Sequence, residues 1–395
     1  MMELHLKDAG WQYILIDYCW YYPYGGTLGN PPQTEDFKPS LSMDDFGRLL
    51  PAVDRFPSAK EGMGFKEIGD YIHSLGLKSG IHIMCGVPKE AVAKKMPIKG
   101  TNYTVDEIMN YTTCSWLNHM YGVDMSKPGS QEYFNSLFEL YAEWGIDYIK
   151  IDDIVSPYYK EEIEGYRKAI DNCGREIVLS LSPGNQTPIE MAEHLKLNAN
   201  MWRISGDSWD DWESLKRQFA YIHKWEKHIG PGRWPDADEL PLGTLNKRGP
   251  HDHGERESNF TTPEKYTLMT LWSICRSPLF YGGDLMVIRP IDLKLLTNKE
   301  IIAVNQNSTN NHQLFRTESH VAWVADIPGM SDKYLAVFNI SEDSKFKAMV
   351  KLKELGFESV VSIHDLWRRK DLWKFKDGFS PAIEAHGAGL FRIMQ

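Results

Sequence analysis

The sequence predicts an α/β protein: a (β/α)8 TIM barrel followed by a C-terminal antiparallel β-sandwich. Up to about residue 305, strand-like apolar runs alternate with amphipathic helix-like stretches, the pattern of parallel strands joined by crossover helices. Beyond that point, short alternating runs separated by turn residues replace the helical periodicity. We therefore expect a barrel domain over residues 1–305 and a sandwich domain over residues 306–395.

The predicted barrel strands end in polar residues or glycine. In chain order they are Tyr13–Asp17, Gly76–Gly86, Asp147–Asp153, Glu176–Gly184, Met201–Asp207, Gly232–Asp238 and Ser277–Asp284. Amphipathic stretches such as Gln131–Trp144 and Glu161–Asn172 are the expected crossover helices. An eight-stranded barrel needs one more strand, which we expect to precede Met1. The predicted sandwich strands are His320–Ala325, Tyr334–Asn339, Ala348–Leu352, Val360–Asp365 and Gly389–Ile393.

The composition is that of an ordinary globular protein with an acidic balance. The net charge of −10 argues against nucleic acid or an anionic membrane as a partner, and no apolar stretch is long enough to span a bilayer. The few cysteines are scattered without a CxxC pair, so neither a disulfide scaffold nor a zinc site is expected. No signal peptide is visible, which leaves a cytoplasmic protein, or a secreted or periplasmic one if a signal precedes the chain.

The run Tyr148-Ile-Lys-Ile-Asp-Asp153 presents the clearest chemical signal. Side chains alternate between the two faces of a strand, so Lys150 and Asp152 share one face and the isoleucines share the other. The isoleucine face must pack on the surrounding helices, which turns Lys150 and Asp152 toward the barrel lumen. Asp153 lies beyond this alternation. An ammonium beside a carboxylate favours its ionised form, which a nucleophile needs, although a structural ion pair is the alternative interpretation.

A second acid follows the run Trp202-Arg-Ile-Ser-Gly-Asp207. Arg203 and Ser205 share one face of the predicted strand, and Asp207 comes after the turn that Gly206 permits. Two carboxylates at different strand ends are the groups that a retaining glycosidase requires. The alternative is that Asp207 or Ser208 caps the helix that follows.

Other predicted strand ends also carry polar residues. They are Asp17, His82, Asp236 and Asp238. The carboxyl ends of barrel strands are where barrel enzymes place their active sites, and carboxylates accept hydrogen bonds from sugar hydroxyls. His251 and His253 resemble a metal-ligand pair, but they lie in a polar loop without a third partner, so we expect no metal. No phosphate-binding or dinucleotide motif occurs, and we expect no cofactor.

At these residues the chain resembles glycoside hydrolase family 27, the family of α-galactosidases and α-N-acetylgalactosaminidases, from about Asp8 onward. The motifs that carry the resemblance are Asp17-Tyr-Cys-Trp20, Lys-x-Asp at residues 150–152, Trp-Arg-x-x-x-Asp at residues 202–207, Trp-x-Asp-x-Asp at residues 234–238 and Ser277-Pro-Leu-Phe-Tyr-Gly-Gly-Asp284. Their order matches that of the family. The resemblance implies a barrel followed by a sandwich and a cofactor-independent hydrolysis that retains the anomeric configuration.

The resemblance also implies the roles of individual residues. Asp152 would be the nucleophile and Asp207 the acid/base, with carboxyl groups about 5–5.5 Å apart. The glycone, a terminal sugar of a galactose-containing oligosaccharide or glycoside, would be bound by Asp17, Lys150, Arg203 and Asp238.

Among the departures from the family pattern, three concern residues of the expected sugar-binding site. Tyr18 stands where galactosidases usually have a second aspartate for sugar hydroxyls, and His82 stands where a tyrosine is common. Ser182 replaces the glutamate that reads the 2-hydroxyl in galactosidases, whereas N-acetylgalactosaminidases tend to have serine there. We include all three among the substrate-binding residues and expect them to affect the choice of sugar more than the mechanism.

The sequence therefore predicts a retaining exo-glycosidase acting on terminal α-D-galactosides. An α-N-acetylgalactosaminidase and a β-L-arabinopyranosidase remain open on the same scaffold, since β-L-arabinopyranose matches galactose without its hydroxymethyl group. Two interpretations of a different class also remain. One is a Schiff-base aldolase that uses Lys150. The other is a sugar-binding protein without catalytic activity. The oligomeric state is not predicted.

Overall fold

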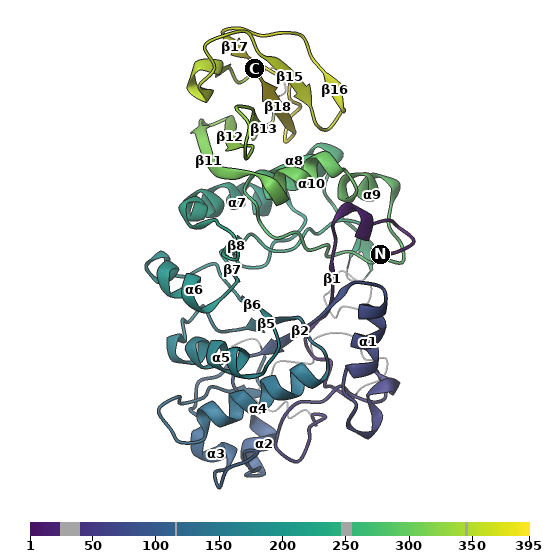
Figure 1. Cartoon of the computed structure of the whole chain (residues 1–395), viewed down its shortest axis with the longest axis vertical. Coiled ribbons are helices and arrows are strands. Elements are labelled where there is room, and N and C mark those ends of the chain that lie inside the picture. The colour runs from purple at the N-terminus through teal and green to yellow at the C-terminus, as the bar shows by residue number, and fades with distance from the viewer. Residues whose placement is uncertain (24–39, 115–116, 246–254, 344–346) are drawn as a thin grey trace. The chain divides into compact units, whose positions relative to one another are not determined.

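The computed structural model describes residues 1–23, 40–114, 117–245, 255–343 and 347–395 (Figure 1). The chain divides into two compact units. Within the described part, one unit comprises residues 12–203, and the other comprises residues 1–11, 204–245 and 255–395.

The unit of residues 12–203 is built on a parallel sheet. Its strands lie in the order β1 (Tyr13–Ile16), β2 (Lys78–Met84), β5 (Tyr148–Asp152), β6 (Val178–Leu181) and β7 (Met201–Arg203). Each coincides with a strand predicted from the sequence but ends earlier, because the polar residues after it belong to the connecting loops. The register places His82 beside Lys150, and Lys150 beside Ser180.

Helices connect these strands along the chain. They are α1 (Lys66–Ser74), α2 (Lys89–Ala93), α3 (Val105–Ile108), α4 (Ser130–Glu143), α5 (Lys160–Asn172) and α6 (Ala192–Asn198). The two crossover helices predicted from the sequence are confirmed as α4 and α5. They lie side by side, with the rings of Phe134 and Tyr166 stacked at a centroid distance of 4.0 Å (Figure 1). Apolar side chains at helical spacing fix this contact. Shorter elements are η2 (Pro57–Gly62), β3 (Val87–Pro88), β4 (Met120–Tyr121) and η3 (Ile189–Met191).

The other unit begins with η1 (Lys7–Ala9) and continues after residue 203. Its elements before the sandwich are α7 (Trp212–Trp225), η4 (Glu226–His228), β8 (Trp234–Asp236), β9 (Thr244–Leu245), β10 (Arg256–Glu257), α8 (Thr262–Ile274), α9 (Pro290–Leu296) and α10 (Lys299–Asn307). Helix α8 opens with a capping box, in which Thr261 and Glu264 satisfy each other's backbone N–H groups.

The strand predicted at Ser277–Asp284 is wrong. In place of a strand, Tyr281 forms a single parallel bridge with Leu240. Pro278 has no N–H to donate to a ladder, and the following Gly282-Gly283 pair weakens an extended strand, which explains why the pairing stays short.

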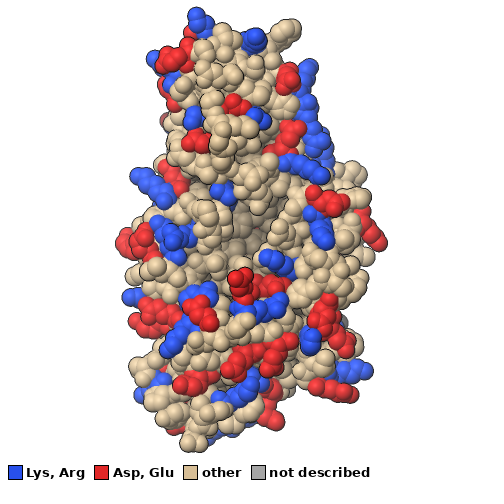
Figure 2. Space-filling view, viewed as in Figure 1, with Lys and Arg blue, Asp and Glu red and all other residues tan. Residues whose placement is uncertain are grey.

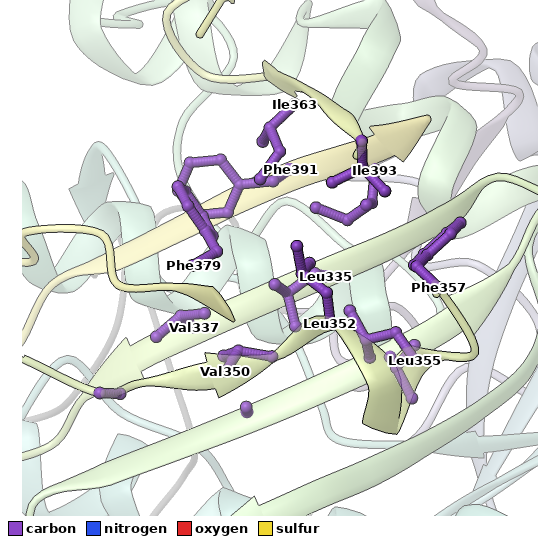
Figure 3. Packing of buried hydrophobic residues seen from close by; sticks show 14 of the residues in the cluster. Leu335, Val337, Val350, Leu352, Leu355, Phe357, Ile363, Phe379, Phe391 and Ile393 are labelled. Carbon is purple, nitrogen blue, oxygen red and sulfur yellow. The ribbon is translucent and has the colours of Figure 1, made fainter. Parts of the chain in front are cut away.

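The end of the chain forms two antiparallel sheets. The larger has the strand order β11 (Thr309–Arg316), β12 (His320–Asp326), β13 (Lys333–Asn339), β18 (Ala388–Met394), β15 (Ser362–Asp365) and β16 (Lys370–Asp371). The smaller pairs β14 (Val350–Lys351) with β17 (Gly378–Phe379), and η5 (Leu352–Leu355) follows β14. Figure 3 shows the apolar core that they enclose, in which Leu335, Val337 and Phe391 face Val350 and Phe379.

Acidic and basic side chains are interspersed over the face of the molecule seen in Figure 2. Among the helices of the described residues, none combines the length and apolar character that crossing a membrane requires.

Candidate active site

The carboxylate of Asp152, the last residue of β5, is held from two neighbouring strands. The Ser182 hydroxyl, one residue beyond β6, donates to Oδ1 of Asp152 at 2.7 Å. On the other side, Nε2 of His82 in β2 lies 3.2 Å from Oδ2, an ion-pair distance. The backbone N–H of Asp153 also donates to Oδ1, at 2.8 Å. Two hydrogen bonds thus hold Oδ1 of this buried carboxylate, and the His82 ring lies beside Oδ2.

His82 joins Asp152 to a second carboxylate. Its Nδ1 lies 2.7 Å from Oδ1 of Asp17, the residue that follows β1. The His82 side chain is 4% exposed, whereas the Asp17 side chain is 81% exposed. The chain Asp17–His82–Asp152 thus runs across the carboxyl ends of three adjacent strands and presents its Asp17 end to solvent.

The surroundings keep both carboxylates ionised. Burial raises the pKa of Asp152, but the contacts from His82 and Ser182 and the charges of Lys150 and His82 outweigh it, so the pKa lies well below the usual range. Desolvation likewise raises the pKa of Asp17, but His82, Lys150 and the Tyr18 N–H outweigh it and lower the pKa to about 2. An ionised Asp152 is the form in which a carboxylate attacks carbon.

Three further predicted residues belong to this unit. Lys150 sits in β5 between His82 of β2 and Ser180 of β6 in the pairing register. Arg203 is the last residue of β7 and is buried. The ring of Tyr18 lies against that of His82, with centroids 5.1 Å apart.

Asp153 occupies different surroundings from Asp152. It lies in a small pocket lined by residues that include Met84, Cys114 and Tyr159. Burial raises its pKa to about 6, helped by the charge of Asp152 and opposed by a hydrogen bond with Cys114. The alternation of side chains along β5 therefore separates the two neighbouring acids, as the sequence pattern indicated.

The unit that starts at residue 204 holds the other predicted acids. Asp207 is exposed, and Asp238 accepts a hydrogen bond at 2.7 Å from the backbone N–H of Ser208, the residue after Asp207. The N–H of Asp238 in turn donates to Asp236 at 2.9 Å. This network positions the Asp207 segment beside the loop that follows β8.

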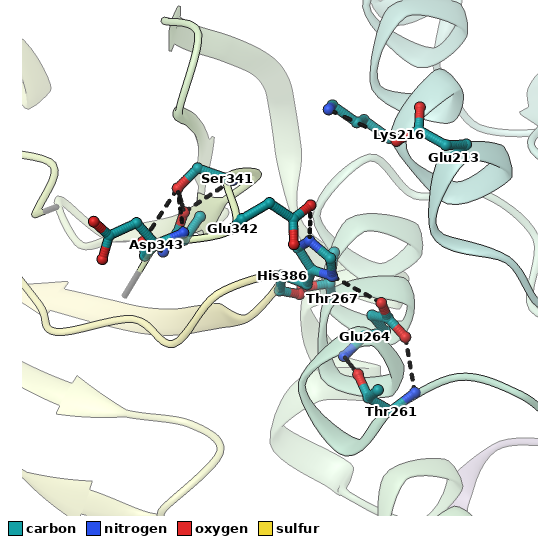
Figure 4. Close-up of polar contacts among 10 residues, drawn as sticks. Glu213, Lys216, Thr261, Glu264, Thr267, Ser341, Glu342, Asp343 and His386 are labelled. Carbon is teal, nitrogen blue, oxygen red and sulfur yellow. Dashed lines mark hydrogen bonds and ion pairs between the residues drawn. The ribbon is translucent and has the colours of Figure 1, made fainter. Parts of the chain in front are cut away.

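Asp207 and Ser208 are not the cap of α7. The cap is Asp211, whose side chain accepts a hydrogen bond from the N–H of Ser214 at 2.7 Å. The capping interpretation of Asp207 is therefore wrong, because the helix starts four residues later than that interpretation requires. Trp212, the first residue of α7, stacks on His386 with centroids 3.9 Å apart. Figure 4 shows the contacts around His386.

Two features of the site were not predicted. The hydrogen bond between Ser182 and Asp152 was missed, although Ser180 and Ser182 alternate along their strand as Lys150 and Asp152 do. The bridging contact of His82 was also missed, because sequence alone gives no rotamer. His251 and His253 lie outside the described residues.

Comparison with known proteins identifies the class of the chain. Residues 99–307 match the model of α-galactosidase A, and residues 317–393 match that of the α-galactosidase C-terminal β-sandwich domain. These matches define a glycoside hydrolase with a (β/α)8 barrel followed by a β-sandwich. The chain belongs to glycoside hydrolase family 27.

The similarity to individual relatives extends over almost the whole chain. A family 27 β-L-arabinopyranosidase from Geobacillus stearothermophilus is 44% identical, with a TM-score of 0.94 over 100% of this chain and 91% of the other. A candidate α-N-acetylgalactosaminidase from Bacillus halodurans is 40% identical, with a TM-score of 0.87 over 99% and 91%. Alpha-galactosidase 2 of Arabidopsis thaliana is 27% identical over 100% of this chain and 82% of its own length.

Proposed function

We propose that this chain is a retaining exo-glycosidase that removes terminal pyranose residues of galactose configuration, namely α-D-galactosides and β-L-arabinopyranosides. The observation that carries the proposal is the buried Asp152 carboxylate, kept ionised by His82, Ser182 and Lys150 at the carboxyl ends of parallel strands. An anionic nucleophile at that end of a barrel strand is what glycosyl transfer to the enzyme needs.

The reaction has two displacements. In the first, a carboxyl oxygen of Asp152 attacks the anomeric carbon while Asp207 protonates the departing glycosidic oxygen. In the second, Asp207 takes a proton from water, the water oxygen bonds to the anomeric carbon, and the bond to Asp152 breaks with its electron pair returning to the carboxylate. Two inversions at one carbon give net retention.

The glycone hydroxyls are bound by charged groups of both signs. Asp17 and Asp238 accept hydrogen bonds from hydroxyls, and Lys150 and Arg203 donate to them. Exposure of the Asp17 side chain supports its role, because a ligand can reach the carboxylate.

Tyr18 favours β-L-arabinopyranosides over α-D-galactosides. A phenol ring resting on His82 occupies the position where galactosidases usually have a second aspartate, so the site loses a full negative charge and gains apolar surface. That change suits a sugar without the hydroxymethyl group. The β-L-arabinopyranosidase that is 44% identical to this chain supports the same choice.

An α-N-acetylgalactosaminidase is the second candidate. The small Ser182 and the relative from Bacillus halodurans favour it. The Ser182 hydroxyl, however, already donates to Asp152, so it serves the nucleophile rather than standing ready for an acetamido group.

A panel of nitrophenyl glycosides tests the proposal. The panel contains α-D-galactoside, β-L-arabinopyranoside and α-N-acetylgalactosaminide, and proton NMR of the first-formed product reports the anomeric configuration. We expect β-L-arabinopyranoside to have the highest kcat/KM and the product to retain configuration.

Two variants of neighbouring acids complete the test. Asp152→Asn should lose activity by a factor on the order of 10⁴ or more, as expected for loss of a nucleophile. Asp153→Asn, which changes the acid in the separate pocket, is the matched control and should keep most of the activity. Inverted product, or an active Asp152→Asn enzyme, would refute the assignment. If borohydride traps a carbonyl substrate on Lys150, the aldolase interpretation replaces it.

A further inference from the structure

We propose that His82 is a positioning residue that couples the glycone-binding carboxylate of Asp17 to the nucleophile Asp152, and that it does not itself bind the sugar. This inference rests on the proposed function of Asp152. It changes the role that the sequence suggested for His82, which was to line the substrate pocket.

Both polar atoms of the His82 ring are already directed at protein carboxylates. Nδ1 lies 2.7 Å from Asp17, and Nε2 lies 3.2 Å from Asp152. With the ring buried, a sugar hydroxyl would have to displace a charged partner to reach either nitrogen.

The position of the ring is fixed from several sides. The indole N–H of Trp20 donates to the His82 carbonyl at 2.9 Å, and Trp20 is fully buried. The ring of Tyr18 covers one side at a centroid distance of 5.1 Å. A strand backbone and a tryptophan thus hold the imidazole where it touches both acids.

Charged groups from two neighbouring strands face the ring. Asp17, which follows β1, lies on one side of the ring, and Asp152 of β5 lies on the other. Lys150 of β5 is the cross-strand neighbour of His82. One carboxylate therefore faces each ring nitrogen, so the ring links the two acids.

A ring in contact with Asp152 affects the two displacements differently. Stabilising the Asp152 carboxylate makes it a weaker nucleophile in the first step but a better leaving group in the second, when the electron pair returns to it. Asp17 fixes the opposite side of the same ring. A sugar hydroxyl that donates to Asp17 therefore acts on Asp152 through His82.

Two amide variants separate the contacts of the ring. The side-chain amide nitrogen of His82→Asn can occupy the place of Nδ1 and retain the contact with Asp17 alone. That of His82→Gln reaches the place of Nε2 and retains the contact with Asp152 alone. His82→Phe removes both contacts and keeps a planar ring. Circular dichroism and thermal unfolding show that each variant is folded before its kinetics are compared.

The kinetic readouts are the pH dependence of kcat/KM and the pre-steady-state release of nitrophenol. For His82→Asn and His82→Phe we expect the acidic limb of the pH profile of kcat/KM to move to higher pH by about one to two pH units, because Asp152 loses a contact that lowers its pKa. We also expect a burst of nitrophenol, because loss of the contact with Asp152 slows the second displacement while it favours the first. His82→Gln should move the limb less than either.

Two results would overturn the coupling. One is an acidic limb that stays in place in all three variants. The other is a change confined to KM and equal in all three, which is the signature of a sugar ligand. If the wild-type protein hydrolyses none of the nitrophenyl glycosides, the proposed function fails, and the coupling is then judged without activity. Nitrogen-15 NMR of the His82 ring should in that case respond to both Asp17→Asn and Asp152→Asn, and a ring that responds to neither refutes the inference.

Discussion

The hydroxyl of Ser182 donates to Oδ1 of Asp152 at 2.7 Å, and both side chains are buried. Hydrogen bonds to a buried carboxylate stabilise its ionised form, so Ser182→Ala should raise the pKa of Asp152. A hydrogen bond to a charged group is worth about 1.5–3 kcal/mol, which predicts a loss of kcat/KM of roughly tenfold to a hundredfold. The loss should be larger at acidic than at neutral pH. If Ser182→Ala and wild type have equal activity at both acidic and neutral pH, the role of the hydroxyl is contradicted.

The change Tyr18→Asp should alter the preference between sugars. It introduces the second carboxylate that galactosidases usually have, which can accept a hydrogen bond from a hydroxyl. We expect the ratio of kcat/KM for α-D-galactoside to that for β-L-arabinopyranoside to rise by about tenfold or more. Tyr18→Phe keeps the ring over His82 and is the matched control, so its ratio should stay near that of wild type. An unchanged ratio in Tyr18→Asp would show that specificity lies elsewhere.

A dependence on the leaving group should distinguish Asp207 from its neighbour Asp211. Asp207→Asn removes the proposed proton donor and should slow hydrolysis of glycosides with poor leaving groups by about 10²–10⁴-fold. Dinitrophenyl glycosides, which depart without protonation, should be affected much less in the first displacement. Asp211→Asn changes only the cap of α7, so its effect should be the same for both leaving groups. Equal losses in Asp207→Asn would argue against an acid/base role.

The buried Glu162 side chain should make the free energy of unfolding depend on pH. Burial raises its pKa from 4.5 to about 8, aided by the charge of Asp153 and opposed by the N–H of Val123. Between these two values the folded protein holds a proton that the unfolded chain has released. The contribution of Glu162 to stability is therefore lost as pH rises toward 8, by an amount on the order of a few kcal/mol.

Urea unfolding at several pH values measures this effect. The Glu162→Gln variant, which cannot ionise, should have a flatter decline in the free energy of unfolding between pH 5 and about 8. Glu161→Gln changes an exposed neighbour and should keep the wild-type slope. Parallel declines in wild type and Glu162→Gln would refute the prediction.

Periodicity predicted the parallel strands because a strand's two faces must meet different environments. The alternation that separates Asp152 from Asp153 is a property of the backbone alone, and isoleucines at residues 149 and 151 fix which face is apolar. The same reasoning failed at residues 277–284, where the apolar run is short and Pro278 removes a donor. An apolar run in the sequence therefore does not by itself show that the segment pairs with a neighbouring strand.

Contacts that depend on rotamers or on the exact start of a helix could not be predicted from the sequence. Asp207, Asp210 and Asp211 are all capable N-caps, and only the backbone geometry selects Asp211. The direction of the His82 ring was equally open, because histidine at a strand end is compatible with a ligand, a base or a bridge. Side-chain chemistry thus identified the candidates, while three-dimensional packing assigned their partners.

His386 ties the sandwich to two helices of the same unit, and its removal should destabilise the protein. The two ring nitrogens of His386 each lie 2.8 Å from a carboxyl oxygen, one of Glu264 in α8 and one of Glu342, and the backbone carbonyl of His386 accepts from the Thr267 hydroxyl (Figure 4). The ring also stacks on Trp212 of α7. Glu264 is nearly buried and also completes the capping box, so losing its partner is costly. We expect His386→Ala to lower the free energy of unfolding by about 1–3 kcal/mol in urea titrations. Glu342→Ala removes a carboxylate that is 83% exposed and should cost less than about 1 kcal/mol. A His386→Ala variant as stable as wild type would show that the stack and the two carboxylates contribute nothing to holding the sandwich against α7 and α8.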